Sequence, residues 1–137
     1  MSLKEIVDVF PEINEDMLAE SGQRWGDTEA YRESMRRAKN YGRQDWETMK
    51  AEQDAIYTEA ATLYSQGILA NDPHMIAVAD KLRQLIDKWH YPCSKAFHVT
   101  LTEMTSTDDR FVNNIDRYGA GLASYIHDAA RANLASE

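Results

Sequence analysis

Apolar residues recur at helical spacing along two long segments of this chain, and this periodicity constrains the fold more than any other feature of the sequence. In residues 44–66, steps of three, four and seven separate the apolar positions, and Gly67 follows as a stop signal. Asp72 and Pro73 form an N-cap and first-turn pair for a second helix, which Pro92 ends. The alternation typical of strands is missing from every long segment. We therefore predict an all-α fold.

Three shorter helices are predicted in the C-terminal part of the sequence. Ser94 can cap the first of them, and either Thr107 or Asp108 can cap the next. Two glycines separate these from a last helix, whose polar end is expected to fray beyond about Asn133. Five helices thus make up a predicted helical core over residues 44–134.

The first third of the sequence has few apolar residues with which to pack. Between residues 19 and 45 they are spread among many charges, so little area can be buried against an ordering cost of about 1–2 kcal/mol per residue. Asp27 and Thr28 make a plausible N-cap, so a helix can form there without a strong reason to dock. We predict a lead segment over residues 1–23 and a weakly ordered lid over residues 24–43 that can fold over a ligand.

Charge and cysteine content narrow the classes of function. The 137 residues carry a formal net charge of -8, which suits neither a self-sufficient DNA or RNA binder nor a protein attracted to acidic membranes. No apolar run is long enough to span a bilayer or to form the core of a signal peptide. Because a single cysteine, Cys93, suits a reducing compartment, we expect a cytoplasmic protein with one domain.

Cys93 is the sharpest chemical signal in the sequence. It follows Pro92 at the start of a predicted helix, where backbone N–H groups and the helix dipole favour a thiolate that could attack an electrophilic ligand. Free cysteines are also among the most buried residues, so a buried and inert thiol is the alternative. The sequence leaves both interpretations open.

The histidines near Cys93 do not make a convincing metal or cofactor site. His90 and His98 flank it, but the paired spacing of a zinc or di-iron site is missing, so no metal and no cofactor are expected. His98 or His127 could in principle hold a haem, although a lone histidine on an apolar face is more often a hydrogen-bonded core residue. A haem or other cofactor binder and a protein interaction module remain the alternative functions.

The chain has 3 Trp, 7 Tyr and 3 Phe, and most of these are expected in an ordinary core. Aromatic residues also build adaptable apolar pockets, and the predicted pocket lies between the helices that carry Trp46, Trp89, Phe97 and Phe111. Three aromatic residues of the N-terminal segment are predicted to close over it, namely Trp25, Tyr31 and Tyr41. Cys93 and His98 complete the predicted ligand-binding set. A basic run is predicted to be a solvated face, namely Arg32, Arg36, Arg37, Lys39 and Arg43.

Four separated motifs resemble the TipAS domain, and they occur in the order of that family over residues 24–133. They are RWGDTEAYRES at 24–34, LIDKWHYPCS at 85–94, DRFVNNID at 109–116, and GLA at 121–123 with DAARAN at 128–133. The resemblance implies a globin-like, all-α domain that recognises thiopeptide antibiotics or other bulky hydrophobic compounds. It implies the drug-binding part of a MerR-family transcriptional activator rather than an enzyme.

The same resemblance implies roles for particular segments. In founding members of the family a cysteine adds to a dehydroalanine of the drug, and Cys93 is the residue that could do so here. An N-terminal segment that closes over the ligand is also implied, in agreement with the burial argument for residues 24–43. The DNA-binding domain and coiled coil of full-length regulators are not in this sequence, so the chain is expected to act on DNA only through such parts.

Overall fold

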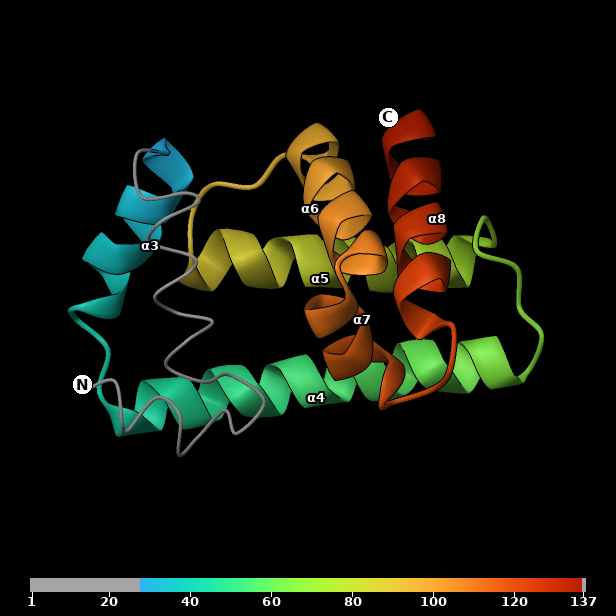
Figure 1. Ribbon diagram of the computed structural model, residues 1–137, viewed down its shortest axis with the longest axis horizontal. Coiled ribbons are helices and arrows are strands. Elements are labelled where there is room, and N and C mark those ends of the chain that lie inside the picture. Colours follow the sequence, from blue (N-terminus) through green and yellow to red (C-terminus); the bar gives the residue numbers. More distant parts are fainter. Residues whose placement is uncertain (1–27, 137) are drawn as a thin grey trace.

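The computed structural model describes residues 28–136, which form helices joined by short connections (Figure 1). The helices are α3 (Glu29–Ala38), α4 (Arg43–Ser65), α5 (Pro73–Trp89), α6 (Lys95–Thr107), α7 (Asp109–Asp116) and α8 (Leu122–Ala135). Within the described residues there is no strand, and the predicted all-α fold is confirmed. None of these helices is both long enough and apolar enough to cross a bilayer.

The two long helices, α4 and α5, pack against each other, and the C-terminal helix α8 binds the remaining elements together. Helix α8 contacts α4, α5, α6 and α7, while α6 also packs on α5 and α7. Figure 1 shows α3 at the opposite end of the molecule from α8, beside the C-terminal end of α5. The helical core is therefore built at one end, and α3 is added at the other.

The main core is a continuous cluster of apolar side chains from α4, α5, α7 and α8. Its largest fully buried members include Met75, Leu122 and Ile126. The turn before α8 depends on Gly121, which has a φ of 86° and whose missing Cβ would lie 2.6 Å from the Tyr64 Oη atom. Only glycine adopts this backbone conformation at no steric cost, so the close approach of α4 and α8 depends on it.

Four of these helices begin at side-chain caps, at positions that the sequence predicts. Asp72, Ser94 and Asp108 each accept a hydrogen bond from a first-turn backbone N–H of α5, α6 and α7 respectively. Asp108 is the cap that is used rather than Thr107, which is the last residue of α6. Thr28 caps α3 in the same way, with Oγ1 at 3.1 Å from the Tyr31 N atom. In each of these four contacts a side chain accepts from a backbone N–H that has no partner within its helix. Such caps explain why the helix starts could be predicted from the sequence.

The end of α8 lies within one residue of the predicted end of the helical core at residue 134. The helix continues to Ala135 and Asn133 is buried, while the fraying expected beyond about Asn133 stays a prediction. The Asn133 side-chain amide donates to the Asp80 Oδ1 atom over 3.0 Å, which anchors the last turn on α5. A polar residue at this position therefore stabilises the helix end instead of loosening it.

Helix α3 buries none of its residues. This agrees with the low apolar content of the segment, while its weak ordering stays a prediction. The lead segment over residues 1–23, the Asp27 part of the predicted cap and the lid residue Trp25 lie outside the described residues.

Candidate binding cleft

An open cleft of about 660 Å³ lies between α3 and the connection from α5 to α6. Helix α3 contributes one wall, with Glu29, Ala30, Arg32, Glu33 and Arg36. The connection contributes Tyr91 and Pro92, and the first turn of α6 contributes Phe97. One side of the cleft is thus mainly charged and the other is apolar.

The apolar side is built from two aromatic rings in edge-to-face contact. The ring centroids of Tyr91 and Phe97 are 5.5 Å apart with an interplanar angle of 89°. Burial raises the pKa of Tyr91 to about 12, so its phenol stays neutral at physiological pH. An edge-to-face pair presents both a ring face and a ring edge to a ligand, which suits aromatic or heteroaromatic groups.

The charged side is organised around Glu33. Its carboxylate accepts hydrogen bonds from Arg36 Nε at 2.7 Å, Arg36 Nη2 at 2.6 Å and Arg37 Nε at 2.7 Å. These bonds, first from Arg36 and then from Arg37, lower the pKa of Glu33 to about 2. The side chains of Glu29 and Arg32 have no hydrogen bond or ion pair to any residue that the structure describes. They therefore leave one carboxylate and one guanidinium for a ligand.

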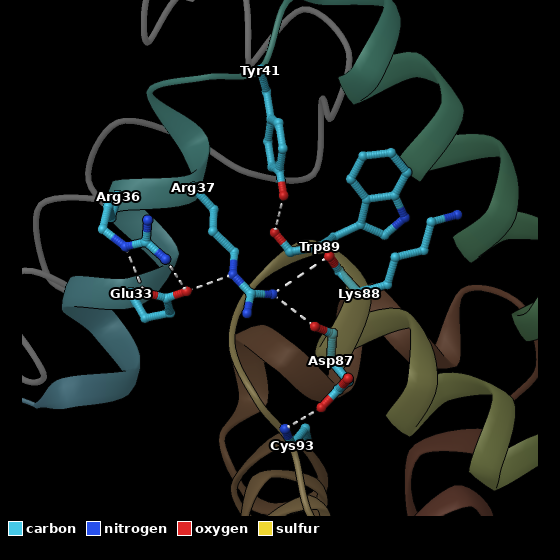
Figure 2. Close-up of polar contacts among 8 residues, drawn as sticks. All are labelled: Glu33, Arg36, Arg37, Tyr41, Asp87, Lys88, Trp89 and Cys93. Carbon is cyan, nitrogen blue, oxygen red and sulfur yellow. Dashed lines mark hydrogen bonds and ion pairs between the residues drawn. The ribbon is translucent and has the colours of Figure 1, made fainter.

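Helix α3 is held on α5 by polar contacts to backbone carbonyls, as Figure 2 shows. Arg37 Nη1 donates to the Asp87 carbonyl over 2.7 Å and to the Lys88 carbonyl over 3.4 Å. Tyr41 Oη donates to the Trp89 carbonyl over 2.6 Å. These contacts were not anticipated from the low apolar content of the segment, and within the basic run Arg37 bonds to α5 instead of facing only solvent. A side-chain pattern does not display backbone acceptors, so nothing in the sequence pointed to this contact. Because α3 buries none of its residues, its weak docking stays a prediction.

Three of the predicted pocket and lid residues form a packed aromatic cluster of their own. The Tyr41 ring lies edge-on to Trp46 at 5.6 Å and to Trp89 at 5.4 Å. Trp46 is buried next to Met49, and the Trp89 indole N–H donates to Glu52 over 2.9 Å. The three predicted residues are therefore together, but none of them lines the cleft.

The remaining predicted aromatic residues are divided. Phe97 lines the cleft, whereas the half-buried side chains of Tyr31 on α3 and Phe111 on α7 do not. Tyr91 was not among the predicted site residues, although it stands in the string HYPCS that carries part of the family resemblance. Contact of Tyr31 and Phe111 with a ligand stays a prediction.

Cys93 follows the cleft residues Tyr91 and Pro92 along the chain, and it is buried, with 2% of its surface exposed. Its backbone N–H donates to Asp87 Oδ1 over 2.8 Å, and its carbonyl accepts from Arg83 Nη1 over 2.9 Å. Burial raises the pKa of the thiol to about 11. Of the two interpretations that the sequence leaves open, this conformation matches the buried thiol. A covalent role stays a prediction that requires the thiol to be uncovered.

His98 lies on α6 and is buried, and the charged side chains that act on it are Arg83 and Asp80 of α5. Burial, with Arg83 as the second cause, lowers the pKa of His98 to about 4. Its Nδ1 atom has no hydrogen-bond partner in the described part of the chain, so the expected hydrogen-bonded core histidine is only half correct. His127, by contrast, places Nδ1 2.9 Å from the Thr102 hydroxyl. In residues 28–136, no three His, Cys, Asp or Glu side chains are grouped as metal ligands would be.

Comparison with known sequences gives one consistent family. A family model described as the TipAS antibiotic-recognition domain matches residues 19–133. The HTH-type transcriptional activators TipA of Streptomyces coelicolor and Streptomyces lividans are each 35% identical over 131 residues, which is 95% of this chain and 52% of the relative. The HTH-type transcriptional activator mta of Bacillus subtilis is 34% identical over 97 residues, which is 71% of this chain and 37% of the relative. The chain spans about half the length of the TipA proteins.

Among solved structures, the chain is similar to TipAS of Streptomyces lividans in complex with nosiheptide. The TM-score is 0.90 at 34% sequence identity, and the match covers 99% of this chain and 96% of that one. That structure is described as part of a thiopeptide antibiotic multidrug resistance system. The match includes both walls of the cleft, α3 and residues 91–97.

Proposed function

Because the chain belongs to the TipAS family of antibiotic-recognition domains, we propose that its cleft binds a thiopeptide antibiotic or another bulky hydrophobic compound. The observation that carries this proposal is the match to TipAS bound to nosiheptide over 99% of the chain. The binding is proposed to be non-enzymatic, because the relatives are transcriptional activators.

The geometry of the cleft supports a ligand of this kind. Its volume of about 660 Å³ lies within the range of roughly 300–1,000 Å³ that is usual for small-molecule sites. The Tyr91 and Phe97 rings can stack against a heteroaromatic surface, while Arg32 and Glu29 can orient its polar groups. An apolar wall with a few convergent polar groups opposite it is typical of ligand sites.

We propose that the predicted site residues complete this cleft once the ligand is bound. Trp25 and Tyr31 belong to the part of the N-terminal segment that would close over the compound, and Tyr41 of the same segment would hold it on α5. Cys93 follows Tyr91 and Pro92 of the apolar wall, where a small movement of the connection would uncover its thiol. The second part of the predicted set is proposed as a supporting layer, namely Trp46, Trp89, His98 and Phe111.

The proposal extends to regulation in the cytoplasm. The TipA relatives are named as HTH-type activators, and this chain matches about half of their length. With a net charge of -8, the chain is not suited to bind DNA by itself. We propose that ligand binding here controls transcription through a DNA-binding part of the kind present in those relatives.

The experiment is a thermal melt and a calorimetric titration with nosiheptide. A compound that binds only the folded protein should add about 2.7 kcal/mol of stability at 100 times its dissociation constant. Phe97→Ala should weaken binding by about tenfold or more, since it removes an aromatic contact of the apolar wall. Phe111→Ala is the comparison, because this half-buried phenylalanine does not line the cleft, so that its loss should weaken binding less than the loss of Phe97.

The outcomes separate the two possible positions of the pocket. If Phe111→Ala weakens binding and Phe97→Ala does not, the ligand does not bind in the cleft beside α3. The pocket then lies deeper between the helices, as predicted from the sequence. No stabilisation of the wild-type protein by nosiheptide or by a panel of hydrophobic drugs would oppose the proposal as a whole. Intact mass after incubation, compared with Cys93→Ser, reveals whether an adduct forms at Cys93.

A further inference from the structure

We propose that Arg37 and Tyr41 are positioning residues that clasp α3 onto the C-terminal end of α5, and that this carbonyl clasp holds the cleft in its binding-competent form. The clasp is defined as the bonds from Arg37 and Tyr41 to the carbonyls of Asp87, Lys88 and Trp89 (Figure 2). Its meaning for ligand binding rests on the proposed function, whereas its existence can be tested without a ligand.

The first support is a complete account of the last carbonyls of α5. The final four carbonyls of a helix have no partner within it. The Ile86 carbonyl accepts from the backbone N–H groups of His90 and Tyr91, at 2.8 and 3.2 Å. The other three belong to Asp87, Lys88 and Trp89, and each of them accepts from a clasp residue. Docking of α3 therefore satisfies the acceptors that the end of α5 leaves open.

The second support is the chemistry of the donors. A guanidinium at the C-terminal end of a helix interacts favourably with the partial negative charge of its dipole. Glu33 accepts from Arg37 Nε over 2.7 Å, which orients the guanidinium so that Nη1 reaches α5. Lysine has the charge but not the planar fork that makes these bonds at the same time. The arrangement thus uses properties specific to arginine.

The third support is that both walls of the cleft depend on the same short segment. Glu33 and Arg36 line the cleft and belong to the helix that Arg37 holds on α5. On the other side, the Asp87 carboxylate accepts from the Cys93 N–H over 2.8 Å and fixes the connection that carries Tyr91. Loss of the clasp would separate one wall from the other while the connection kept its own anchor.

Apolar packing gives α3 little reason to stay in place by itself. None of its residues is buried, and only Ala38 at its end and Tyr41 just beyond it pack on the Trp46 cluster. The polar clasp must therefore supply much of the interaction that positions the α3 wall. In contrast, α4 and α5 share a buried apolar core and do not depend on it.

The test is amide hydrogen exchange over α3 in the whole chain, without ligand and with nosiheptide. Removal of a hydrogen bond made by a charged group should speed exchange of the α3 amides about tenfold or more in Arg37→Gln. Arg37→Lys should recover part of the protection, and Tyr41→Phe should give a smaller increase of about threefold to tenfold. Exchange in α5 and α8 should not change. A general loss of stability would instead speed exchange in those helices as well.

Two control variants match the chemistry of the test variants. Arg36→Gln removes the same charge and an ion pair to the same Glu33, but Arg36 makes no bond to α5, so α3 exchange should change less than about threefold. Tyr125→Phe removes an equally short bond, 2.6 Å from the hydroxyl to the Ile68 carbonyl, at the other end of the molecule. It should leave both α3 exchange and nosiheptide affinity unchanged, whereas Tyr41→Phe should lower that affinity.

Each result decides the matter. Equal α3 exchange in Arg37→Gln and Arg36→Gln overturns the clasp, as does an α3 that is unprotected in the wild-type protein both with and without nosiheptide. If the wild-type protein does not bind nosiheptide but Arg37→Gln selectively exposes α3, the clasp stands and the proposed ligand class fails. If binding occurs and the clasp variants bind as tightly as the wild type, the clasp does not position the cleft.

Discussion

The Asn133 side chain of α8 donates a hydrogen bond to the Asp80 carboxylate of α5 over 3.0 Å. The same carboxylate accepts from Arg83 Nε over 2.7 Å, and Arg83 reaches on to the Cys93 carbonyl. The bond from Arg83 is the main reason that the pKa of Asp80 lies well below its ordinary value of 3.8. One half-buried carboxylate, through its own bonds and those of Arg83, thus ties the last helix to α5 and to the connection that carries Cys93.

Asp80→Asn should lower the free energy of unfolding by about 1–3 kcal/mol, because the bonds to Arg83 and Asn133 lose their ionic partner. The folded-state pKa of Asp80 is depressed, so its contribution is present above about pH 4 and is lost as pH falls through the folded value. Urea denaturation at pH 7 measures the effect. Asp128→Asn is the control, since this exposed carboxylate of α8 bonds to none of the residues that the structure describes, and it should change stability by less than about 0.5 kcal/mol.

Stability should fall as the solution is acidified from neutral pH, well before the carboxylates titrate. Burial lowers the pKa of both His98 and His90 to about 4, so below the ordinary value of 6.5 the unfolded chain binds more protons than the folded one. For His98 alone the loss between pH 7 and pH 5 is roughly 2 kcal/mol. His98→Gln should therefore flatten the pH dependence of the denaturation midpoint.

The exposed histidine His74 provides the comparison for this experiment, since 84% of its side chain is accessible. His74→Gln should keep the wild-type decline of stability between pH 7 and pH 5. A His98→Gln variant with an unaltered slope would contradict the assignment of the decline to the buried ring.

The Cys93 thiol should react slowly in the ligand-free protein. With its pKa raised from 9.0 to about 11 by burial, the thiolate fraction at pH 7.5 is smaller than in the unfolded chain by roughly 100-fold. Alkylation by iodoacetamide, followed by intact mass at pH 7.5 with and without urea, measures the ratio of the two rates. A native rate equal to that in urea would mean that Cys93 is open in solution.

Gly121→Ala should be more destabilising than Gly67→Ala, although both glycines have positive φ values, 86° and 76°. At Gly67 nothing lies within 4 Å of the added Cβ, so the cost is the backbone strain of about 1 kcal/mol. At Gly121 the Cβ would lie 2.6 Å from Tyr64 Oη, which adds about 1 kcal/mol or more through displacement of the ring. Thermal melts of the two variants give the difference, and equal melting temperatures would show that Tyr64 moves aside freely.

The helical core could be predicted from the sequence because its signals are local. The apolar period of residues 44–66, the Asp72–Pro73 start and the Ser94 cap each lie within one or two turns of the helix that they define. Such signals depend on backbone geometry that every helix shares. The family motifs then placed the chain in its fold, which the match to TipAS confirms.

The cleft was harder to predict because its contacts are long-range and partly made with the backbone. On residue type alone, the predicted pocket groups Trp46, Trp89, Phe97 and Phe111. In the structure the two tryptophans pack with Tyr41, and Phe97 meets Tyr91. Composition identifies which residues can line a pocket, but only the crossing of helices decides which of them face one another. The short α3 was likewise judged by its apolar content, which does not count donors to carbonyls.

The residues that line the cleft and the residues that form the main apolar core are two separate sets. Tyr91, Pro92 and Phe97 are absent from the core cluster that joins α4, α5, α7 and α8. Substitutions in the proposed binding cleft should therefore carry little penalty to folding. A lineage that changes the compound it binds can then inherit the same scaffold, which is the pattern expected of relatives that keep their architecture at about one-third sequence identity.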